Sequence, residues 1–325
     1  MKLADDFSVE PTEEELLAAH CWERDDHLST DTEMTRFRRT TRYRQFQWRE
    51  ASGHPIGTQP HRPRPGQTVR PVGSRMPLDY AMSTGANLIT PAAFHAARNR
   101  TSFIERHQSF DHQRLWADLL SSEALAFNLL GDLASDTKAS TNLVESWFPD
   151  APGPVTEIRF AYSPGRLDPS YLNSLRAFDA IIILDAGAGR RGLVAIDVKY
   201  HELMKPEIPK PANRTRNLEV AARSRLFRDG SSEALTQRTA MCEPWLEHLL
   251  MLSMLQHPSA NWVWGRYVII HPAGNIAVTR AFTDYRDHLL DENAITTITF
   301  EDYLNSTCLP PAARHTLHGR YAPHA

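Results

Sequence analysis

The chain has 325 residues, of which 41% are hydrophobic and 23% are charged, so it can bury a sizeable core and is neither disordered nor fibrous. Its 36 Lys and Arg against 39 Asp and Glu leave a net charge of -3, which by itself points to no class of partner. Three widely spaced cysteines (Cys21, Cys242 and Cys308) form no C-x-x-C pair, which argues against a disulfide framework or a cysteine zinc site.

Nothing in the sequence predicts export or a membrane partner. The first residues, Met-Lys-Leu-Ala-Asp-Asp, lack the charged and then apolar pattern of a signal peptide. No apolar run approaches the ~20 residues that a membrane-spanning helix needs. We therefore expect a reduced, cytoplasmic protein.

Charge is distributed unevenly along the first 75 residues. Residues 1–35 hold eleven acids against Lys2 and Arg24, and Thr12-x-x-Glu15 predicts a capping box at the start of a short helix. Residues 36–75 hold ten arginines against Glu50. Their first part suits a helix over 34–50, and the Pro- and Gly-rich stretch 53–77 suits an extended connector.

Two interpretations of this basic segment are open. Its arginines, with Arg42, Arg44 and Arg49 as candidates, would form an arm that binds a nucleic-acid backbone. Alternatively, the segment is a solvated helix that pairs with the acidic first 35 residues, because the charges of the two segments, -9 and +9, cancel.

From residue 76 the composition becomes that of a folded domain, so we expect an N-terminal extension over 1–75 and a domain over 76–325. Helices are expected to begin at Thr90 and to span 114–133 and 234–256. Strands are expected over 155–162, 178–184, 193–200 and 266–271, and the last 17 residues are expected to be frayed. This order predicts an α/β sandwich around a mixed sheet.

The strand over 193–200 contains the sharpest chemical signal. Val194, Ile196, Val198 and Tyr200 share one face, which leaves Asp197 and Lys199 on the other face, ~6.5 Å apart. Charged groups inside an apolar strand are costly to bury without compensation.

Asp179 breaks the preceding apolar strand in the same way. A short turn joins the two strands, so they should pair and bring Asp179 beside Asp197 and Lys199. Two such carboxylates suit Mg²⁺, and the lysine would orient or deprotonate a water. The alternative is a buried ion pair that fixes the strand register.

The tripeptide Asp197-Val198-Lys199 alone is a weak signal, because Asp136-Thr137-Lys138 has the same Asp-x-Lys pattern within a polar stretch. Asp179 followed by Asp197-x-Lys199 nevertheless resembles the PD-(D/E)xK nuclease superfamily. Segments 121–129, 47–57 and 86–91 are similar to a group of largely uncharacterised bacterial members regarded as restriction endonucleases, and the similarity spans most of 37–305. One departure is Phe178, which stands where the superfamily name has proline.

The resemblance implies a restriction-endonuclease-like three-layer αβα sandwich with a central mixed sheet, preceded by a helical extension. It implies that Asp179 and Asp197 bind Mg²⁺ or Mn²⁺, with the Val198 carbonyl as a further ligand and Lys199 as the catalytic lysine. Glu123 resembles the helix acid that some branches add to the metal shell. These roles carry the expectation of a DNA endonuclease of restriction or defence type, with RNA as an alternative substrate and a homodimer as a possible assembly.

Basic residues after the catalytic strand extend the expected nucleic-acid contact. His201 follows Lys199 and would touch a phosphate, and Lys205, Lys210, Arg214 and Arg216 flank three prolines in the next loop. An ordinary strand end and a solvated loop are the alternatives.

Two other function classes stay open. A non-catalytic nucleic-acid-binding module would keep the fold without the chemistry. A dinucleotide-dependent oxidoreductase is suggested by the G-x-G-x-x-G spelling of residues 187–192, but that fingerprint needs a helix next, and here an apolar strand is expected.

Overall fold

A five-stranded mixed sheet forms the centre of the computed structural model, which describes residues 10–23, 26, 32–59, 68–306 and 308–321. The strand order is β3-β4-β5-β6-β7; the pairs β3/β4 and β4/β5 are antiparallel, and β5/β6 and β6/β7 are parallel. The strands are β3 (Val155–Tyr162), β4 (Phe178–Asp185), β5 (Arg191–Val198), β6 (Trp262–His271) and β7 (Ile295–Thr299).

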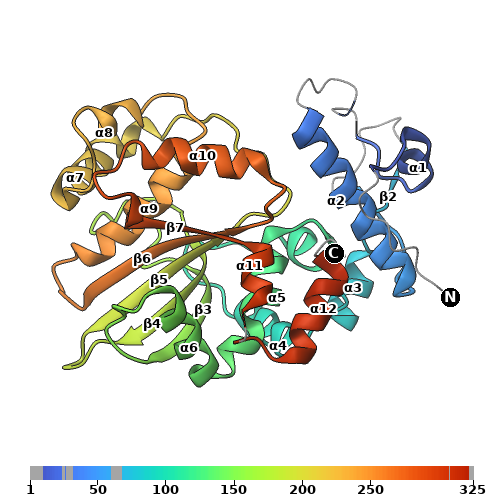
Figure 1. The fold of residues 1–325 in the computed structure, drawn as a ribbon, viewed down its shortest axis with the longest axis horizontal. Helices are drawn as coiled ribbons and strands as arrows, with labels where there is room; N and C mark the ends of the chain where they lie inside the picture. The colour runs from blue at the N-terminus through green and yellow to red at the C-terminus, as the bar shows by residue number, and fades with distance from the viewer. Residues whose placement is uncertain (1–9, 24–25, 27–31, 60–67, 307, 322–325) are drawn as a thin grey trace.

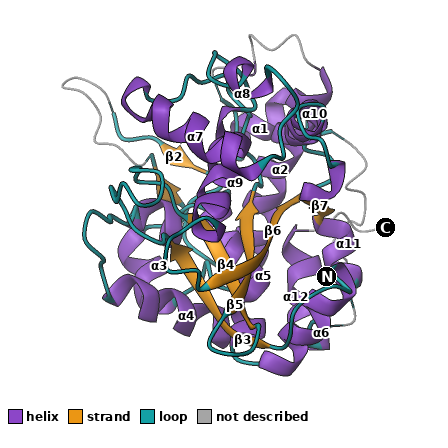
Figure 2. Cartoon of the chain, turned by 90° about the vertical axis from the view of Figure 1, so that its left-hand side faces the viewer, coloured by secondary structure: helices purple, strands orange, loops and turns teal. Residues whose placement is uncertain are grey.

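Helices cover both faces of this sheet (Figures 1 and 2). One layer contains α4 (Pro91–Ser102), α5 (Ser122–Ala134), α6 (Thr137–Trp147), α11 (Phe300–Asn305) and α12 (Pro311–Tyr321). The other contains α7 (Arg214–Ser224), α8 (Ser231–Ala234), α9 (Cys242–Leu255) and α10 (Ile276–Arg286). The expected three-layer αβα sandwich is therefore confirmed.

Alternation along β5 divides its side chains between two cores, as the strand pattern predicts. Val194, Ile196 and Val198 pack toward the α5 layer. Leu193 and Ala195 pack toward the α9 layer, which is the face that Asp197 shares. Both faces are buried, so any charged group on this strand has to find a partner inside the protein.

Helical elements precede the sheet, as expected. They are α1 (Glu13–Ala18), α2 (Thr32–Ala51) and α3 (Leu78–Thr84), with a short hairpin of β1 (Gly57–Thr58) and β2 (Pro71–Val72) between α2 and α3. The predicted capping box is present: Glu15 N donates to Thr12 Oγ1 at 3.2 Å, and Thr12 N donates to Glu15 Oε2 at 2.8 Å. Helix α2 packs against α12 and α10. The described helices include none that is both long and apolar enough to span a bilayer.

The helix expected over 114–133 is wrong as a single element. A π-helical turn (Gln113–Ala117) ends before Asp118, and α5 begins only after Ser121, whose hydroxyl accepts from Ala124 N. Asp118 is held by an isolated β-bridge and an ion pair to Arg75, 2.6 Å from Arg75 Nη2 to its carboxylate. These tertiary contacts outweigh the helical periodicity.

The expected helix over 234–256 and the expected frayed C-terminus are also wrong. The first begins only at Cys242, as α9, because α8 ends at Ala234 and Thr239 pairs with Glu207 through two backbone hydrogen bonds. Residues 311–321 form α12, in which Leu317, Arg320 and Tyr321 are buried; the expectation for 322–325 lies outside the described residues.

Candidate active site

The antiparallel pairing of β4 and β5 brings the two predicted aspartates together. Ala180 pairs with Ile196, so the next step of the same register places Asp179 opposite Asp197. Asp179 Oδ2 accepts a hydrogen bond from Val198 N at 2.7 Å, and Asp197 Oδ2 accepts from the Tyr267 hydroxyl at 2.6 Å. These hydrogen bonds fix the orientation of both carboxylates, and a backbone hydrogen bond from Asp179 also acts on Asp197.

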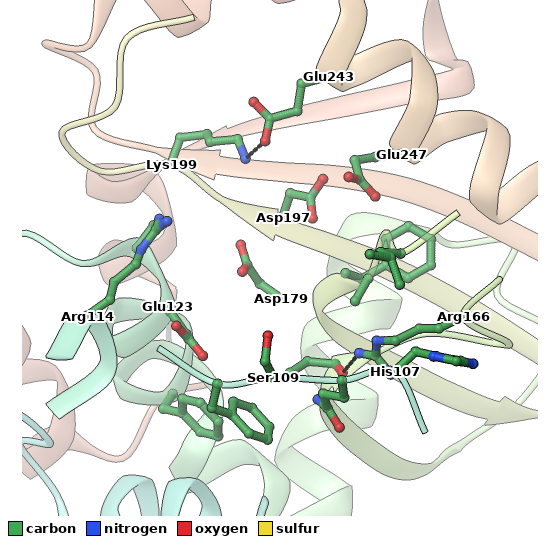
Figure 3. A pocket seen from close by; sticks show the side chains of 18 residues that line it. His107, Ser109, Arg114, Glu123, Arg166, Asp179, Asp197, Lys199, Glu243 and Glu247 are labelled. Carbon is green, nitrogen blue, oxygen red and sulfur yellow. Dashed lines mark hydrogen bonds and ion pairs between the residues drawn. The ribbon is translucent and has the colours of Figure 1, made fainter. Parts of the chain in front are cut away.

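Lys199 reaches the same point from the end of β5, where its backbone N–H still bonds to Ile270 O. Its Nζ donates to Glu243 Oε1 of α9 at 2.8 Å (Figure 3). Burial alone would lower the pKa of Lys199, but Glu243, Asp197 and Asp179 outweigh burial and raise it. The group is therefore a fixed ammonium, suited to neutralising negative charge and to orienting a water rather than to accepting a proton.

Glu123 lies in the first turn of α5, on the other side of the cavity from α9 (Figure 3). Burial raises its pKa to about 7, against the opposing effect of Arg114. Arg114 Nη2 donates to Ser122 Oγ at 2.8 Å and to Glu202 Oε1 at 3.0 Å, so this cation is anchored at the cavity rim.

These side chains surround one cavity of about 340 Å³. Five carboxylates and three cationic side chains line it, so the cavity has an excess of negative charge: Glu123, Asp179, Asp197, Glu243 and Glu247; Arg114, Arg166 and Lys199. His107, Ser109 and Phe110 add a wall from the loop before α5. A phosphodiester would be repelled from this lining unless a cation joined it.

The buried aspartates have pKa values that match this excess charge. Burial raises the pKa of Asp179, and the neighbouring Asp197 charge raises it further. Burial also raises the pKa of Asp197, although Lys199 and the Tyr267 hydroxyl oppose the rise. Two carboxylates that resist joint ionisation are a ready site for a divalent cation, whose charge would stabilise both in the ionised form.

The donor set fits a hard divalent ion. Asp179 and Asp197 offer carboxylate oxygens side by side, and the Val198 carbonyl follows on the same strand. Within the described ranges, no three His, Cys, Asp or Glu side chains lie close enough to form a metal cluster by themselves. That geometry suits Mg²⁺, which is commonly bound through one or two carboxylates and keeps several waters. Glu123 lines the same cavity.

The structure places the predicted arm residues away from this cavity. Arg42 and Arg49 are each only 1% exposed. Arg42 bonds to Asp26 Oδ2 at 2.5 Å and to Glu23 Oε2 at 3.1 Å, and Arg49 donates to Gly73 O at 2.9 Å. Arg44 Nη1 donates to Tyr321 O at 2.9 Å. These guanidinium groups hold α2 to its surroundings.

The residues after Lys199 divide into two sets. His201 is buried beside Arg38 and Arg42. Burial lowers its pKa, and the positive charges of the two arginines lower it further. Arg216 donates to the carbonyls of Ser170 and Tyr171, so it ties α7 to the loop before β4.

The other set, Lys205, Lys210 and Arg214, is exposed to solvent. Lys210 lines a second cavity next to the catalytic one. The loop over 205–214 thus offers cations that a nucleic-acid backbone can reach.

Two motifs that sequence reasoning treated as decoys have structural roles. Asp136 caps α6 by accepting from Ala139 N at 2.9 Å, which explains the second Asp-x-Lys match. Gly187 and Gly189 have φ values of 74° and 73° in the β4–β5 hairpin, and β5 follows directly. The glycine-rich run therefore lacks the helix that a dinucleotide site needs.

Sequence reasoning missed Arg114, Glu243, Glu247 and Tyr267. Glu243 and Glu247 stand one helical turn apart in the otherwise apolar α9, and this anomaly in the sequence could have identified them. Tyr267 sits in an apolar strand and carries no comparable signal.

A family model described as the PD-(D/E)XK nuclease superfamily matches residues 30–323. No curated protein and no solved structure gives a significant match to the chain. The matched range contains all of the cavity residues and both helical layers.

Proposed function

Because the chain belongs to the PD-(D/E)XK nuclease superfamily, a family that suggests nuclease activity, we propose that it is a divalent-metal-dependent endonuclease that hydrolyses DNA phosphodiester bonds. A restriction or defence role is part of the same proposal. The observation that carries it is the meeting of Asp179, Asp197 and Lys199 at one cavity.

Each group has a distinct task in this proposal. Asp179 and Asp197 would hold Mg²⁺ or Mn²⁺, with the Val198 carbonyl beside them. A bound divalent ion would polarise a phosphoryl oxygen and lower the pKa of a water. Lys199 orients the attacking water and offsets charge that develops on the phosphate, and Glu243 holds its ammonium in place. Arg114 meets a neighbouring phosphate oxygen from the rim.

The test is cleavage of supercoiled, linear and single-stranded DNA, and of RNA, with Mg²⁺, with Mn²⁺ and with EDTA. We expect metal-dependent cleavage that falls by about 10²- to 10³-fold in Lys199→Ala. Asp197→Asn should lose cleavage and retain DNA binding.

The chain offers a matched control in Lys138→Ala, which alters the exposed lysine of the second Asp-x-Lys match and should cleave normally. A wild-type protein that binds DNA but stays inert with both metals would instead support a non-catalytic binding module.

A further inference from the structure

A second cavity of about 360 Å³ adjoins the catalytic one. Leu175 lines both cavities. Arg176 faces the second cavity and Glu247 faces the first, and the two side chains bond to each other at 2.6 Å. The two cavities are therefore neighbours, divided only by these side chains. One ligand strand that crosses them would contact both cavities.

Apolar side chains form about half of the lining of the second cavity, and polar or charged side chains, Glu207 among them, form the rest. Leu172 and Leu246 are buried in its floor, and Ile208, 58% exposed, stands at its rim. Asn213, Asn217 and Lys210 add polar atoms.

Asn217 is the observation that points to a ligand. The residue is only 2% exposed and lines this cavity. Across the described residues, its side-chain amide forms no hydrogen bond, whereas the nearby Asn213 donates to Asn173 O at 3.1 Å. The Asn217 amide is not sealed off from solvent, so it is open to the cavity, where a ligand can form the hydrogen bonds that the protein does not supply.

We propose that this second cavity is a nucleobase subsite, which takes the base next to the scissile phosphate. The side-chain amide of Asn217 offers a donor NH₂ group and an acceptor oxygen. This pair complements the donor and acceptor on the edge of a base, and the edge of adenine fits it best. Leu172, Leu246 and Ile208 pack against the flat faces of the base, and Lys210 meets its phosphate. This inference rests on the proposed nuclease function, because that function supplies the strand.

Mapping of cut positions on a random-sequence DNA library tests the subsite. We expect the wild type to prefer one base beside the cut, and Asn217→Ala to lower that preference by about tenfold, the loss typical of one amide–base pair. Asn99→Ala, an exposed asparagine on α4, is the matched control and should keep the preference. Equal use of all four bases by the wild type, or an unchanged preference in Asn217→Ala, would overturn the proposal.

A binding measurement separates this inference from the proposed chemistry. Each of the four deoxynucleoside monophosphates is titrated calorimetrically into the full chain without metal. Saturable binding that Asn217→Ala weakens about tenfold supports the subsite even if no cleavage is ever seen. Ile208→Trp fills the cavity from its exposed rim without altering the interior, and should block the same binding. If none of the four nucleotides binds, the subsite proposal is wrong, whereas the nuclease proposal is unaffected.

Discussion

The hydroxyl of Tyr267 orients Asp197, one of the two proposed metal ligands, from the adjacent strand. It donates to Asp197 Oδ2 at 2.6 Å, and both residues are buried. Partners that hold a metal ligand from behind fix its orientation and favour its charged form. Tyr267 is therefore a positioning residue for the site, although it touches neither the metal nor the substrate.

We expect Tyr267→Phe to weaken Mn²⁺ binding by about 10- to 100-fold, as loss of such an outer partner usually does. The pKa of Asp197 should rise further, because a hydrogen bond to its ionised form is lost. Isothermal titration with Mn²⁺ measures the change. Tyr285→Phe is the matched control, since that buried hydroxyl bonds to His248 Nδ1 and to no aspartate. Equal Mn²⁺ affinity in both variants would contradict the role.

The protonation of Glu123 makes the metal-free protein sensitive to pH. Burial raises its pKa from an ordinary 4.5 to about 7, so the native state holds this proton more tightly than the unfolded chain does. Its contribution to the free energy of unfolding is thus complete below about pH 4.5 and is lost as the pH rises through about 7.

Thermal unfolding with EDTA between about pH 5 and about pH 8 tests this effect. The melting temperature of Glu123→Gln should fall less over that range than that of the wild type, because the glutamine cannot ionise. Glu145→Gln, an exposed glutamate of α6, should follow the wild type. Parallel curves for all three proteins would show that Glu123 ionises freely.

At the scale of single residues, the sequence predicts those site residues that stand out from their immediate neighbours in the chain. Asp179, Asp197 and Lys199 interrupt apolar strands, and strand alternation with a short turn is enough to bring them together. Arg114 and Tyr267 carry no such anomaly. Their positions depend on a π-helical turn and on the β5–β6 crossover pairing, both of which are products of the tertiary fold.

Among the elements, α12 is the one whose importance the sequence conceals. Arg320 is fully buried; its guanidinium donates to Asn87 O at 2.8 Å, to Asn87 Oδ1 at 2.6 Å and to Gln45 Oε1 at 3.0 Å. It also lies 4.2 Å from the centroid of the Trp48 ring. One side chain of the last helix thus joins α2 to the loop after α3. The sequence of this segment, which is rich in proline and lies at the end of the chain, gives no sign of this buried contact.

Arg320→Ala should lower the free energy of unfolding by about 2 kcal/mol or more, because it leaves two buried oxygens, Asn87 Oδ1 and Gln45 Oε1, without this donor, at about 1–3 kcal/mol each before relaxation. The Asn87 carbonyl oxygen keeps the hydrogen bond from Asn128 Nδ2. Urea unfolding measures the loss. Arg314→Ala changes a half-buried arginine of the same helix and should cost under about 1 kcal/mol. A similar loss in the two variants would mean that helix propensity rather than the buried network is responsible.

On the scale of the whole molecule, four arginines of α2 pair with acids of the N-terminal segment among the described residues. Arg36 and Arg39 bond to Glu10, and Arg38 and Arg42 bond to Glu23. The pairing of a basic helix with the acidic segment was one of the two interpretations open from charge alone, and sequence could not decide between them because it does not give the distances. The loop over 205–214 remains an exposed basic feature, and its Lys210 lines the cavity next to the catalytic one.

Salt dependence of DNA binding distinguishes the two basic regions. Each phosphate contact contributes about -0.9 to the slope of log K against log salt, so Lys205→Ala with Lys210→Ala should make the slope shallower by about 1.8. Fluorescence anisotropy with the non-cleaving Asp197→Asn protein measures it. Arg42→Gln should leave the slope unchanged and instead lower stability, since it removes the 2.5 Å ion pair of the buried Asp26 carboxylate and leaves only the longer one to Arg39, at 3.7 Å. A shallower slope in Arg42→Gln, with no change in the double lysine variant, would instead indicate that α2 contacts the nucleic acid.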